Sequence, residues 1–488
     1  MASPGPLVNC DSFMSDTPSN YLAGKCKKYF NDPIHGYISF DGCSMDIVDT
    51  PQFQRLRYLK QMGSSYFVFP GACHNRFEHC LGVGYLAGTL TQRFKDSQPE
   101  LEISDAEVRN VQIAGLCHDL GHGPFSHVFD AAVIPTLSPQ STWKHEQGSL
   151  MMFDYLVEDN YVDIDREDVE FIKDLIMGRP QHHGNRFEER RFLFDIVANQ
   201  RNGVDVDKFD YISRDCYNVN LKSSYDSSRL MIASRVINDQ ICYDHKEVYN
   251  IYDMFHTRYS LFKRIYTHRV AVAIELMLVD AIVKANSSLN LLEKIQDPEQ
   301  YLYLTDGILH DILRSSDPAL AESKRLIKRI QCRQLYKFVD EFVVPGDHKD
   351  KLDKTVINAE AIVAHQPDNA HLSADDVIVE WLPLSYGKKD QNPVNSIQFY
   401  NKFNDYQSFH IPRQNVSCLI PTTFSEMAIR VYARDINKVG MIQRAFRRLM
   451  KQWQLQPNSP QIDYVPNQGH EVPGAFESPR KRRLTFLE

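Results

Sequence analysis

Residues 115–123 read GLCHDLGHG and place a histidine and an aspartate directly after a run of apolar residues. The preceding residues, 111–117, carry apolar side chains at helical spacing, and two glycines follow the pattern. His118 and Asp119 therefore lie at the end of an apolar helix, where charged residues are rare unless they are paired or bind a metal. This stretch predicts a mainly helical core with a polar site at a helix end.

Two distant segments supply further ligands of the same chemistry. His79 ends the run HNRFEH at 74–79, and Asp207 lies in RNGVDVDK at 201–208. Neutral imidazole and carboxylate groups suit a divalent ion such as Mn, Fe or Zn, and an ion with open positions makes a hydroxide available near neutral pH. A lone His-Asp pair is more often structural, but further histidines follow it closely, so a metal site and a structural role both stay open at this point.

The composition limits the class of protein. The chain has 488 residues, 43% of them hydrophobic, and a net charge of −8. These values are ordinary for a globular protein and argue against a general polyanion binder, so any nucleotide site must be a local basic patch. Its ten cysteines are scattered without a C-x-x-C pair, as in reduced intracellular proteins. We find no signal peptide, and residues 270–279 are too short to span a membrane.

The pattern divides the chain into four parts. We expect a flexible tail at 1–27, an all-helical core at 28–340, a smaller α+β lobe at 341–455 and a disordered basic tail at 456–488. Within the core and lobe, apolar spacing predicts helices at 168–177, 245–285 (one helix or a pair), 301–315, 319–339 and 435–454. Short β-rich runs predict strands at 342–344, 376–381, 396–400 and 428–433.

Residues 82–87, GVGYLA, match the pattern G-x-G-x-x-A. That pattern binds dinucleotides only between a strand and a helix. Here it follows His79 and no strand precedes it, so we reject dinucleotide binding.

Longer strings carry a specific resemblance from about residue 28 to residue 432. They are NDPIHG (31–36), DTPQFQRLR (49–57), FPGA (69–72), HNRFEH (74–79), HDLGHGPFSHVF (118–129), HEQGS (145–149) and DMFHTR (253–258). With the H…HD…D signature, they resemble the animal SAM-and-HD-domain deoxynucleoside triphosphate triphosphohydrolases. The resemblance implies an HD-domain fold and hydrolysis of a dNTP to a deoxynucleoside and inorganic triphosphate. In that family this reaction controls cellular dNTP levels and restricts viral reverse transcription.

The resemblance also assigns the catalytic residues. It implies that His79, His118, Asp119 and Asp207 hold the metal, and that water attacks the α-phosphorus while the 5′ oxygen leaves. His127 would be the general acid, because imidazole titrates near neutrality. The residues that would support it or neutralise the α-phosphate are Asp130, His145, Arg76 and His122.

Substrate-binding residues follow from the same resemblance. Lys208, Tyr211 and Arg258 would hold the β and γ phosphates. Gln61 and Asp215 would bind the 3′-hydroxyl, and Met62 would crowd the 2′ position. The residues expected to line the sugar and base region are Tyr66 and Tyr266.

The family is activated by nucleotides that drive assembly of a homotetramer. GTP or dGTP would fill one allosteric site and a dNTP the other, with Mg²⁺ bridging the bound triphosphates. The guanine site maps to Lys28, Asp49, Gln54, Arg57, Arg430 and Arg434, with Tyr29 in the same allosteric set. The second site maps to Asn31, Val68, Arg229, Lys246, Asn250, His268 and Arg269.

Three departures from the family stand out. No segment before residue 28 is long enough for a SAM domain, so we expect that module to be missing. Asp244 stands where an arginine of the second allosteric site is usual, which would weaken phosphate binding. Phe262 replaces a histidine that faces the active site, whereas Arg269 keeps the charge of the usual lysine.

The C-terminal tail combines three short motifs. Residues 479–483, PRKRR, suit nuclear import, so we expect a nuclear protein that also occurs in the cytoplasm. Ser478 begins a cyclin-dependent kinase motif, and residues 482–486 resemble a cyclin-docking motif. The plain alternative is a solvated basic end.

Two other functions remain open. One is an HD phosphodiesterase or nuclease, although a diester has no γ phosphate for Lys208, Tyr211 and Arg258 to hold. The other is a scaffold that binds single-stranded nucleic acid. The metal (Fe, Mn, Zn or Mg) and the base preference also stay open.

Overall fold

The computed structural model describes residues 27–455 except 41, 181–189, 350 and 369. The predictions for the two tails, including Ser478 and the basic cluster, lie outside the described residues. Among the described helices, none is both long and apolar enough to cross a membrane.

A body of helices forms around the larger of two hydrophobic cores. The helices up to residue 331 are α1 (Gly42–Val48), α2 (Pro51–Gln54), α3 (Arg76–Ser97), α4 (Asp105–Cys117), α5 (Ile134–Leu137), α6 (His145–Asp159), α7 (Arg166–Met177), α8 (Phe194–Val197), α9 (Val206–Asn218), α10 (Ser227–Ile232), α11 (Val248–Leu261), α12 (Arg269–Leu289), α13 (Leu291–Lys294), α14 (Pro298–Leu302), α15 (Ile308–Arg314) and α16 (Ala321–Gln331). Two π-helical turns, η4 (Phe129–Val133) and η8 (Phe262–Tyr266), interrupt this body.

Small residues let α3 and α4 approach closely. A Cβ atom on Gly84 would lie 2.6 Å from the Leu116 side chain, and one on Gly88 would lie 2.6 Å from Gln112. Gly115 of α4 faces Gly84 and Ala87 at 3.0 Å in the same way. Gly84 and Ala87 of the G-x-G-x-x-A run therefore form a helix-packing surface, and this packing sets the C-terminal end of α4 beside the first turn of α3.

The described strands form three sheets. β1 (Lys28–Asp32) and β2 (Gly36–Phe40) make an antiparallel hairpin. The second sheet has the order β3-β4-β7-β8, with β4 and β7 parallel, and the third has the antiparallel order β5-β9-β6. Their bounds are β3 Ser234–Ile237, β4 Gln240–Asp244, β5 Lys337–Val344, β6 Val377–Ser385, β7 Gln398–Asn401, β8 Asn404–Phe409 and β9 Ser425–Ala433.

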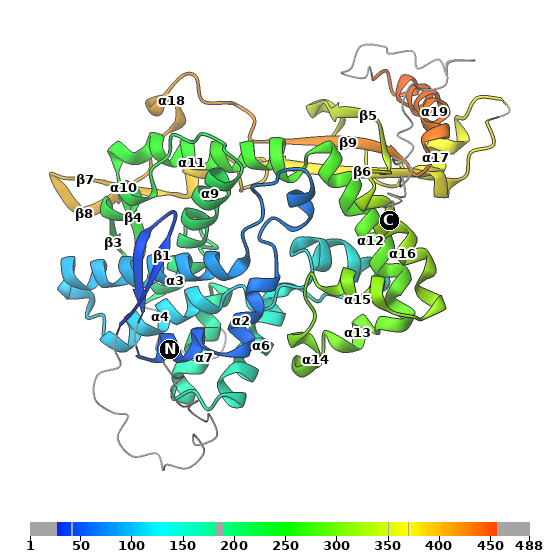
Figure 1. Cartoon of the computed structure of the whole chain (residues 1–488). Coiled ribbons are helices and arrows are strands. Elements are labelled where there is room, and N and C mark those ends of the chain that lie inside the picture. Colours follow the sequence, from blue (N-terminus) through cyan, green and yellow to red (C-terminus); the bar gives the residue numbers. More distant parts are fainter. Residues whose placement is uncertain (1–26, 41, 181–189, 350, 369, 456–488) are drawn as a thin grey trace, which may run out of the picture.

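The second hydrophobic core lies between the β5-β9-β6 sheet and two helices, α17 (Ala359–Ala364) and α19 (Val439–Gln452). Apolar side chains of α19, such as Ile442 and Phe446, are fully buried there. A further short helix, α18 (Arg413–Val416), follows β8. Figure 1 shows the β5-β9-β6 sheet at the opposite end of the molecule from the β3-β4-β7-β8 sheet.

The mainly α fold and most of the predicted elements are confirmed. Residues 245–285 form the helix pair α11 and α12, and all four β-rich runs lie in or overlap strands. The prediction of one helix at 319–339 was wrong, because α16 ends at Gln331 and β5 begins at Lys337. The predicted helix at 301–315 is also broken, between α14 and α15.

Strands also occur where only helices were expected. β1 to β4 lie within the part predicted to be all-helical, and β7 pairs with β4. The residues expected to form one lobe are therefore divided between two sheets and two cores.

Candidate functional site

Two helix starts and one helix end fix three polar side chains of the candidate site. Asn75 is the N-cap of α3, and its N–H donates to the Glu78 carboxylate (3.2 Å). His79 directly follows Glu78 in the sequence. Asp205 caps α9 by accepting from the Lys208 N–H (3.1 Å), which sets Asp207 in the first turn. His118 directly follows the last residue of α4.

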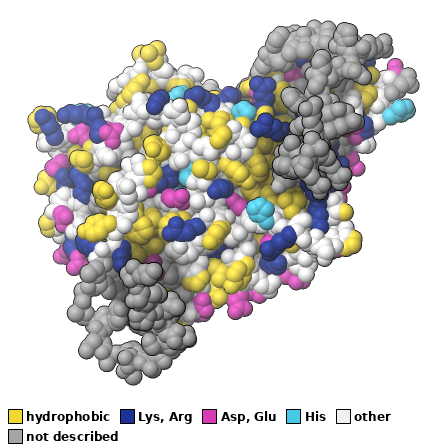
Figure 2. Space-filling view, viewed as in Figure 1, with side chains coloured by type: hydrophobic (Ala, Val, Ile, Leu, Met, Phe, Trp, Pro, Cys, Tyr) yellow, Lys and Arg dark blue, Asp and Glu magenta, His cyan; other side chains and the backbone are white. Residues whose placement is uncertain are grey.

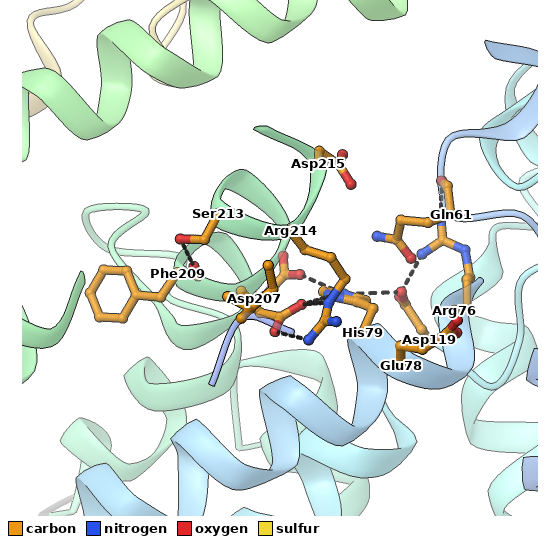
Figure 3. A network of polar contacts seen from close by, with 12 residues as sticks. Gln61, Arg76, Glu78, His79, Asp119, Asp207, Phe209, Ser213, Arg214 and Asp215 are labelled. Carbon is orange, nitrogen blue, oxygen red and sulfur yellow. Dashed lines mark hydrogen bonds and ion pairs between the residues drawn. The ribbon is translucent and has the colours of Figure 1, made fainter. Parts of the chain in front are cut away.

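These segments bring His79, His118, Asp119 and Asp207 together (Figure 3 shows three of them). Nε2 of His79 lies 3.2 Å from Nε2 of His118 and 3.2 Å from Oδ1 of Asp207. It lies 3.5 Å from Oδ2 of Asp119. Nε2 of His118 is 3.5 Å from Asp119 and 3.6 Å from Asp207.

The chemistry of this group fits a divalent metal ion. The Nδ1–H of His118 donates to the Gly115 carbonyl (2.8 Å), and that of His79 donates to Asp210 (2.7 Å). With Nδ1 carrying the proton, both Nε2 atoms present a lone pair to the same point, beside two carboxylates. Two facing lone pairs repel unless a cation lies between them, and imidazole with carboxylate is a suitable ligand set for a divalent metal.

The same surroundings favour positive charge at this point. Burial alone would lower the pKa of His79, but hydrogen bonds to Asp207 and Asp210 raise it to about 10. Burial alone would raise the pKa of Asp119, but the charges of Arg76 and His118 hold it well below its usual range. A proton and a metal ion therefore compete for Nε2 of His79.

A second group of four side chains lies beside this centre. The His145 Nδ1 atom is 2.7 Å from an oxygen of Asp130, and the His127 Nδ1 atom is 3.7 Å from the other oxygen. The His122 ring stacks on His145 at 3.9 Å. Asp130 lies in the π-helical turn η4, a rare form of helix that is common at functional sites.

The pKa values of two histidines in this group shift in opposite directions. Burial, with the charges of Arg76 and His145, lowers the pKa of His122 well below its ordinary value. A low pKa favours the neutral imidazole form of His122, and its expected contact with the α-phosphate stays a prediction. The hydrogen bond to Asp130 raises the pKa of His145 although burial opposes it. His127 is 70% exposed and so can reach a substrate.

Both groups open into one cavity of about 680 Å³, a size typical of small-molecule sites. It is lined by Gln61, Met62, Gly63, Ser64, Ser65, Arg76, His79, Asp119, His122, Phe125, Ser126, His127, Val128, His145, Glu146, Asp207, Lys208, Tyr211, Asp215, Arg258, Phe262, Tyr266 and Glu275. Expected metal ligands, histidines, cations and aromatic side chains thus line the same cavity.

Comparison with known proteins agrees with this site. An HD domain matches residues 76–215, and an HD associated region matches residues 225–458. The chain is 45% identical to the Deoxynucleoside triphosphate triphosphohydrolase SAMHD1 homolog of Dictyostelium discoideum, over 91% of this chain and 84% of that protein. It is 42% identical to Deoxynucleoside triphosphate triphosphohydrolase SAMHD1 of Bos taurus, over 90% and 80%, and of Homo sapiens, over 87% and 73%. The chain belongs to the SAMHD1 family of deoxynucleoside triphosphate triphosphohydrolases.

The cations that the family resemblance assigns to the phosphates all line the cavity. Arg76 forms an ion pair with Asp119 and donates to the Ser126 hydroxyl (2.8 Å). Lys208 pairs with Asp205 (3.0 Å), which raises its pKa to about 12 although burial opposes it. Arg258 donates to the Ser385 carbonyl (3.0 Å), and its Nε atom is buried without a partner among the described residues.

The sugar-binding residues of the family are also grouped, with one correction. Asp215 accepts from the Tyr266 hydroxyl (2.5 Å) and lies 2.6 Å from His74. Gln61, Met62 and Tyr211 line the cavity beside them. Tyr66 does not line this cavity; its ring packs against Phe67 at 4.2 Å. It follows Gly63, Ser64 and Ser65 in the helical turn η2 (Gly63–Phe67), and those three residues line the cavity.

Residues of the expected guanine site fall into two separate groups. Arg57 donates to Gln54 (2.7 Å) beside α2, and exposed Asp49 lies just before that helix. Arg430 pairs with Glu341, and Arg434 with Asp280 at 3.1 Å, both on the side of the β5-β9-β6 sheet. No hydrogen bond or ion pair joins the two groups within the described chain. Lys28 and Tyr29 are exposed on β1.

The second expected allosteric site is also only partly assembled. Arg229 and Asn250 both contact Glu247, and exposed Lys246 lies next to it. His268 lies beside Arg269 and packs against Phe69, the neighbour of Val68. Asn31 is exposed on β1. The Asp244 carboxylate accepts a hydrogen bond from the Lys246 N–H (3.0 Å). Figure 2 shows basic and acidic side chains interspersed over this face of the molecule.

Sequence reasoning missed several residues that hold the site in place. Asp205, His74 and Asp210 contact Lys208, Asp215 and His79 respectively. Only Asp205 had a local signal, since an aspartate before a helix start is a typical cap. The other two act across more than 100 residues of sequence and leave no local pattern.

Proposed function

We propose that this chain hydrolyses dNTPs to deoxynucleoside and inorganic triphosphate in the cavity of about 680 Å³. The convergence of His79, His118, Asp119 and Asp207 beside cations and an exposed histidine carries the proposal. A divalent ion of the Fe, Mn or Zn type, held by those four residues, would make a nucleophilic hydroxide available near neutral pH.

The chain's own residues account for the other parts of the reaction. His127 donates a proton to the leaving 5′ oxygen, and Asp130 with His145 holds that proton donor in place. Arg76 lies next to the expected metal ligands and forms an ion pair with Asp119. From this position it would neutralise charge on the α-phosphate.

The cavity also fits a triphosphate and a deoxyribose. Lys208, Tyr211 and Arg258 line one part and would bind the β and γ phosphates, for which a phosphodiester offers no counterpart. Gln61 and Asp215 would bind the 3′-hydroxyl. Met62 is 7% exposed and would exclude a 2′-hydroxyl. The aromatic rings of Phe262 and Tyr266 suit stacking with a base.

Nucleotide activation is part of the proposal. GTP or dGTP at one site and a dNTP at the other, each with Mg²⁺, would assemble a homotetramer and switch on hydrolysis. The two separated groups around Arg57 and Arg430 are compatible with a site completed by a second copy of the chain. Control of dNTP levels and restriction of reverse transcription would follow.

Product analysis tests the proposal. Purified protein is incubated with dGTP, and separately with dATP with and without GTP, in Mg²⁺, and the products are resolved by chromatography. We expect deoxynucleoside and triphosphate, with dATP cleaved only when GTP is present. Release of a deoxynucleoside monophosphate, or no turnover with the metal bound, would instead support a phosphodiesterase or a nucleic-acid-binding scaffold.

A further inference from the structure

We propose that Asp210, held by His35 and Arg214, is a positioning residue that aims His79 at the metal, so that the β1–β2 hairpin is part of the metal centre. The proposal rests on the metal site of the proposed function and adds residues outside its ligand set.

The Asp210 carboxylate is fully occupied by side chains. Its Oδ2 atom accepts from the His79 Nδ1–H (2.7 Å) and the Arg214 Nε–H (2.9 Å). Its Oδ1 atom accepts from His35 Nε2–H (2.7 Å) and Arg214 Nη2 (2.8 Å). Asp210 is completely buried, so these four hydrogen bonds determine the orientation of the carboxylate and of the imidazole that it contacts.

The hairpin is bound to this carboxylate at two points. Arg214 extends from Asp210 to Oδ2 of Asp32 (2.8 Å). The other oxygen of Asp32 accepts from the backbone N–H groups of Ile34 (2.8 Å) and His35 (2.9 Å). The same aspartate therefore binds the arginine and shapes the turn that presents His35.

A gap on α3 makes room for the carboxylate. A Cβ atom on Gly82 would lie 1.9 Å from Oδ1 of Asp210 and 2.6 Å from Nη2 of Arg214. Gly82 lies one helical turn after His79, so the helix that carries the ligand also leaves space for the group that orients it. This accounts for the first glycine of the G-x-G-x-x-A run.

The contact with Asp210 affects how His79 can bind a metal ion. A hydrogen bond from Nδ1–H of His79 to a carboxylate fixes the tautomer, holds the ring plane and makes Nε2 more basic. Without His35 the carboxylate loses one of its four hydrogen bonds, whereas without the Asp210 carboxylate the buried Arg214 also loses one of its two acidic partners and keeps only Asp32.

The test measures metal binding without any substrate. Metal-free protein is titrated with Co²⁺, and the visible absorption of the bound ion gives both affinity and coordination geometry. We expect His35→Ala to weaken Co²⁺ binding by about 10-fold and Asp210→Asn by up to ~100-fold, as outer-sphere changes do. His35→Gln keeps an N–H donor near the Nε2 position and should restore most of the affinity.

Two control variants isolate positioning from general damage. Tyr37→Ser changes an exposed residue of the same hairpin. Asp340→Asn breaks another buried pair of aspartate and arginine, with Arg447 (2.8 Å), in the second core. Both controls should bind Co²⁺ as the unmodified protein does. Thermal unfolding identifies any variant that is not folded.

Unchanged Co²⁺ affinity and spectrum in folded His35→Ala would overturn the proposal, even if Asp210→Asn fails to fold. Equal weakening in His35→Gln and His35→Ala would also overturn it, because the donor would then be irrelevant. If the unmodified protein binds Co²⁺ in this manner but cleaves no dNTP, the proposed function fails while this inference stands.

Discussion

One half-buried carboxylate, Asp306, connects two loops of the active site. Its Oδ1 atom accepts from the Phe125 N–H (2.6 Å), and its Oδ2 atom accepts from the Lys60 N–H (2.9 Å). The loop that contains Phe125 continues to His127, and the loop that contains Lys60 continues to Gln61. Burial raises the pKa of Asp306 to about 6, against the two backbone hydrogen bonds that lower it.

This raised pKa predicts a pH-dependent stability. Between pH 3.8 and about 6 the folded chain keeps a proton on Asp306 that the unfolded chain has lost, so stability falls as pH rises through this window. Two pKa units correspond to about 3 kcal/mol. Relative to Asp306→Asn, the unmodified protein should therefore lose most of this, about 2 kcal/mol of unfolding free energy, from pH 4 to pH 6.5.

Denaturant unfolding at a series of pH values measures the effect. Asp168→Asn, which changes a carboxylate paired with Arg109 at the surface, should keep the slope of the unmodified protein. A difference between Asp306→Asn and the unmodified protein that stays constant over this pH range would contradict the account.

At the scale of elements, the packing of α3 on α4 determines where His79 meets His118. Gly84 lies where a side chain would meet Leu116, so we expect Gly84→Val to cost about 1–3 kcal/mol of unfolding free energy through overpacking. At Gly346 no atom lies within 4 Å of an added Cβ, which makes Gly346→Val a matched control.

Urea unfolding of both variants gives the comparison. Equal loss in the two variants would show that steric contact between the helices is not the cause. A loss confined to Gly84→Val, together with weaker metal binding, is the expected outcome.

The sequence predicts those elements whose pattern is local. The amphipathic helix α7 and the end of α4 follow from helical spacing. The boundary between α16 and β5 does not, because apolar residues continue across it and the strand depends on pairing with β9, about 90 residues later. The short strands β1 to β4 were missed for another reason, because they pair locally as two hairpins inside a segment whose pattern is mostly helical.

The same distinction between local and distant signals applies to the residues of the site. The metal ligands could be found because each lies in a specific string such as HNRFEH or GLCHDLGHG. Asp210 and Asp306 could not, since their roles arise from contacts 131 and 181 residues away in sequence. Tyr66 lies outside the lining of the cavity, although Gly63, Ser64 and Ser65 of the same turn line it.

At the scale of the whole molecule, residues from both family regions build one site. The HD domain region supplies the metal ligands, whereas Arg258, Phe262 and Tyr266 come from the HD associated region. The substrate cavity therefore depends on the packing of α11 and α12 against the HD helices. The second region thus supplies Arg258, one of the cations proposed to bind the β and γ phosphates.

The most direct test of the central claim is hydrolysis of dGTP in H₂¹⁸O, followed by mass spectrometry of both products. Attack of water on the α-phosphorus predicts one ¹⁸O atom in the released triphosphate and none in deoxyguanosine. A His118→Ala, Asp119→Ala double variant should form neither product. Label in deoxyguanosine, a monophosphate product, or unchanged turnover by the double variant would contradict the account.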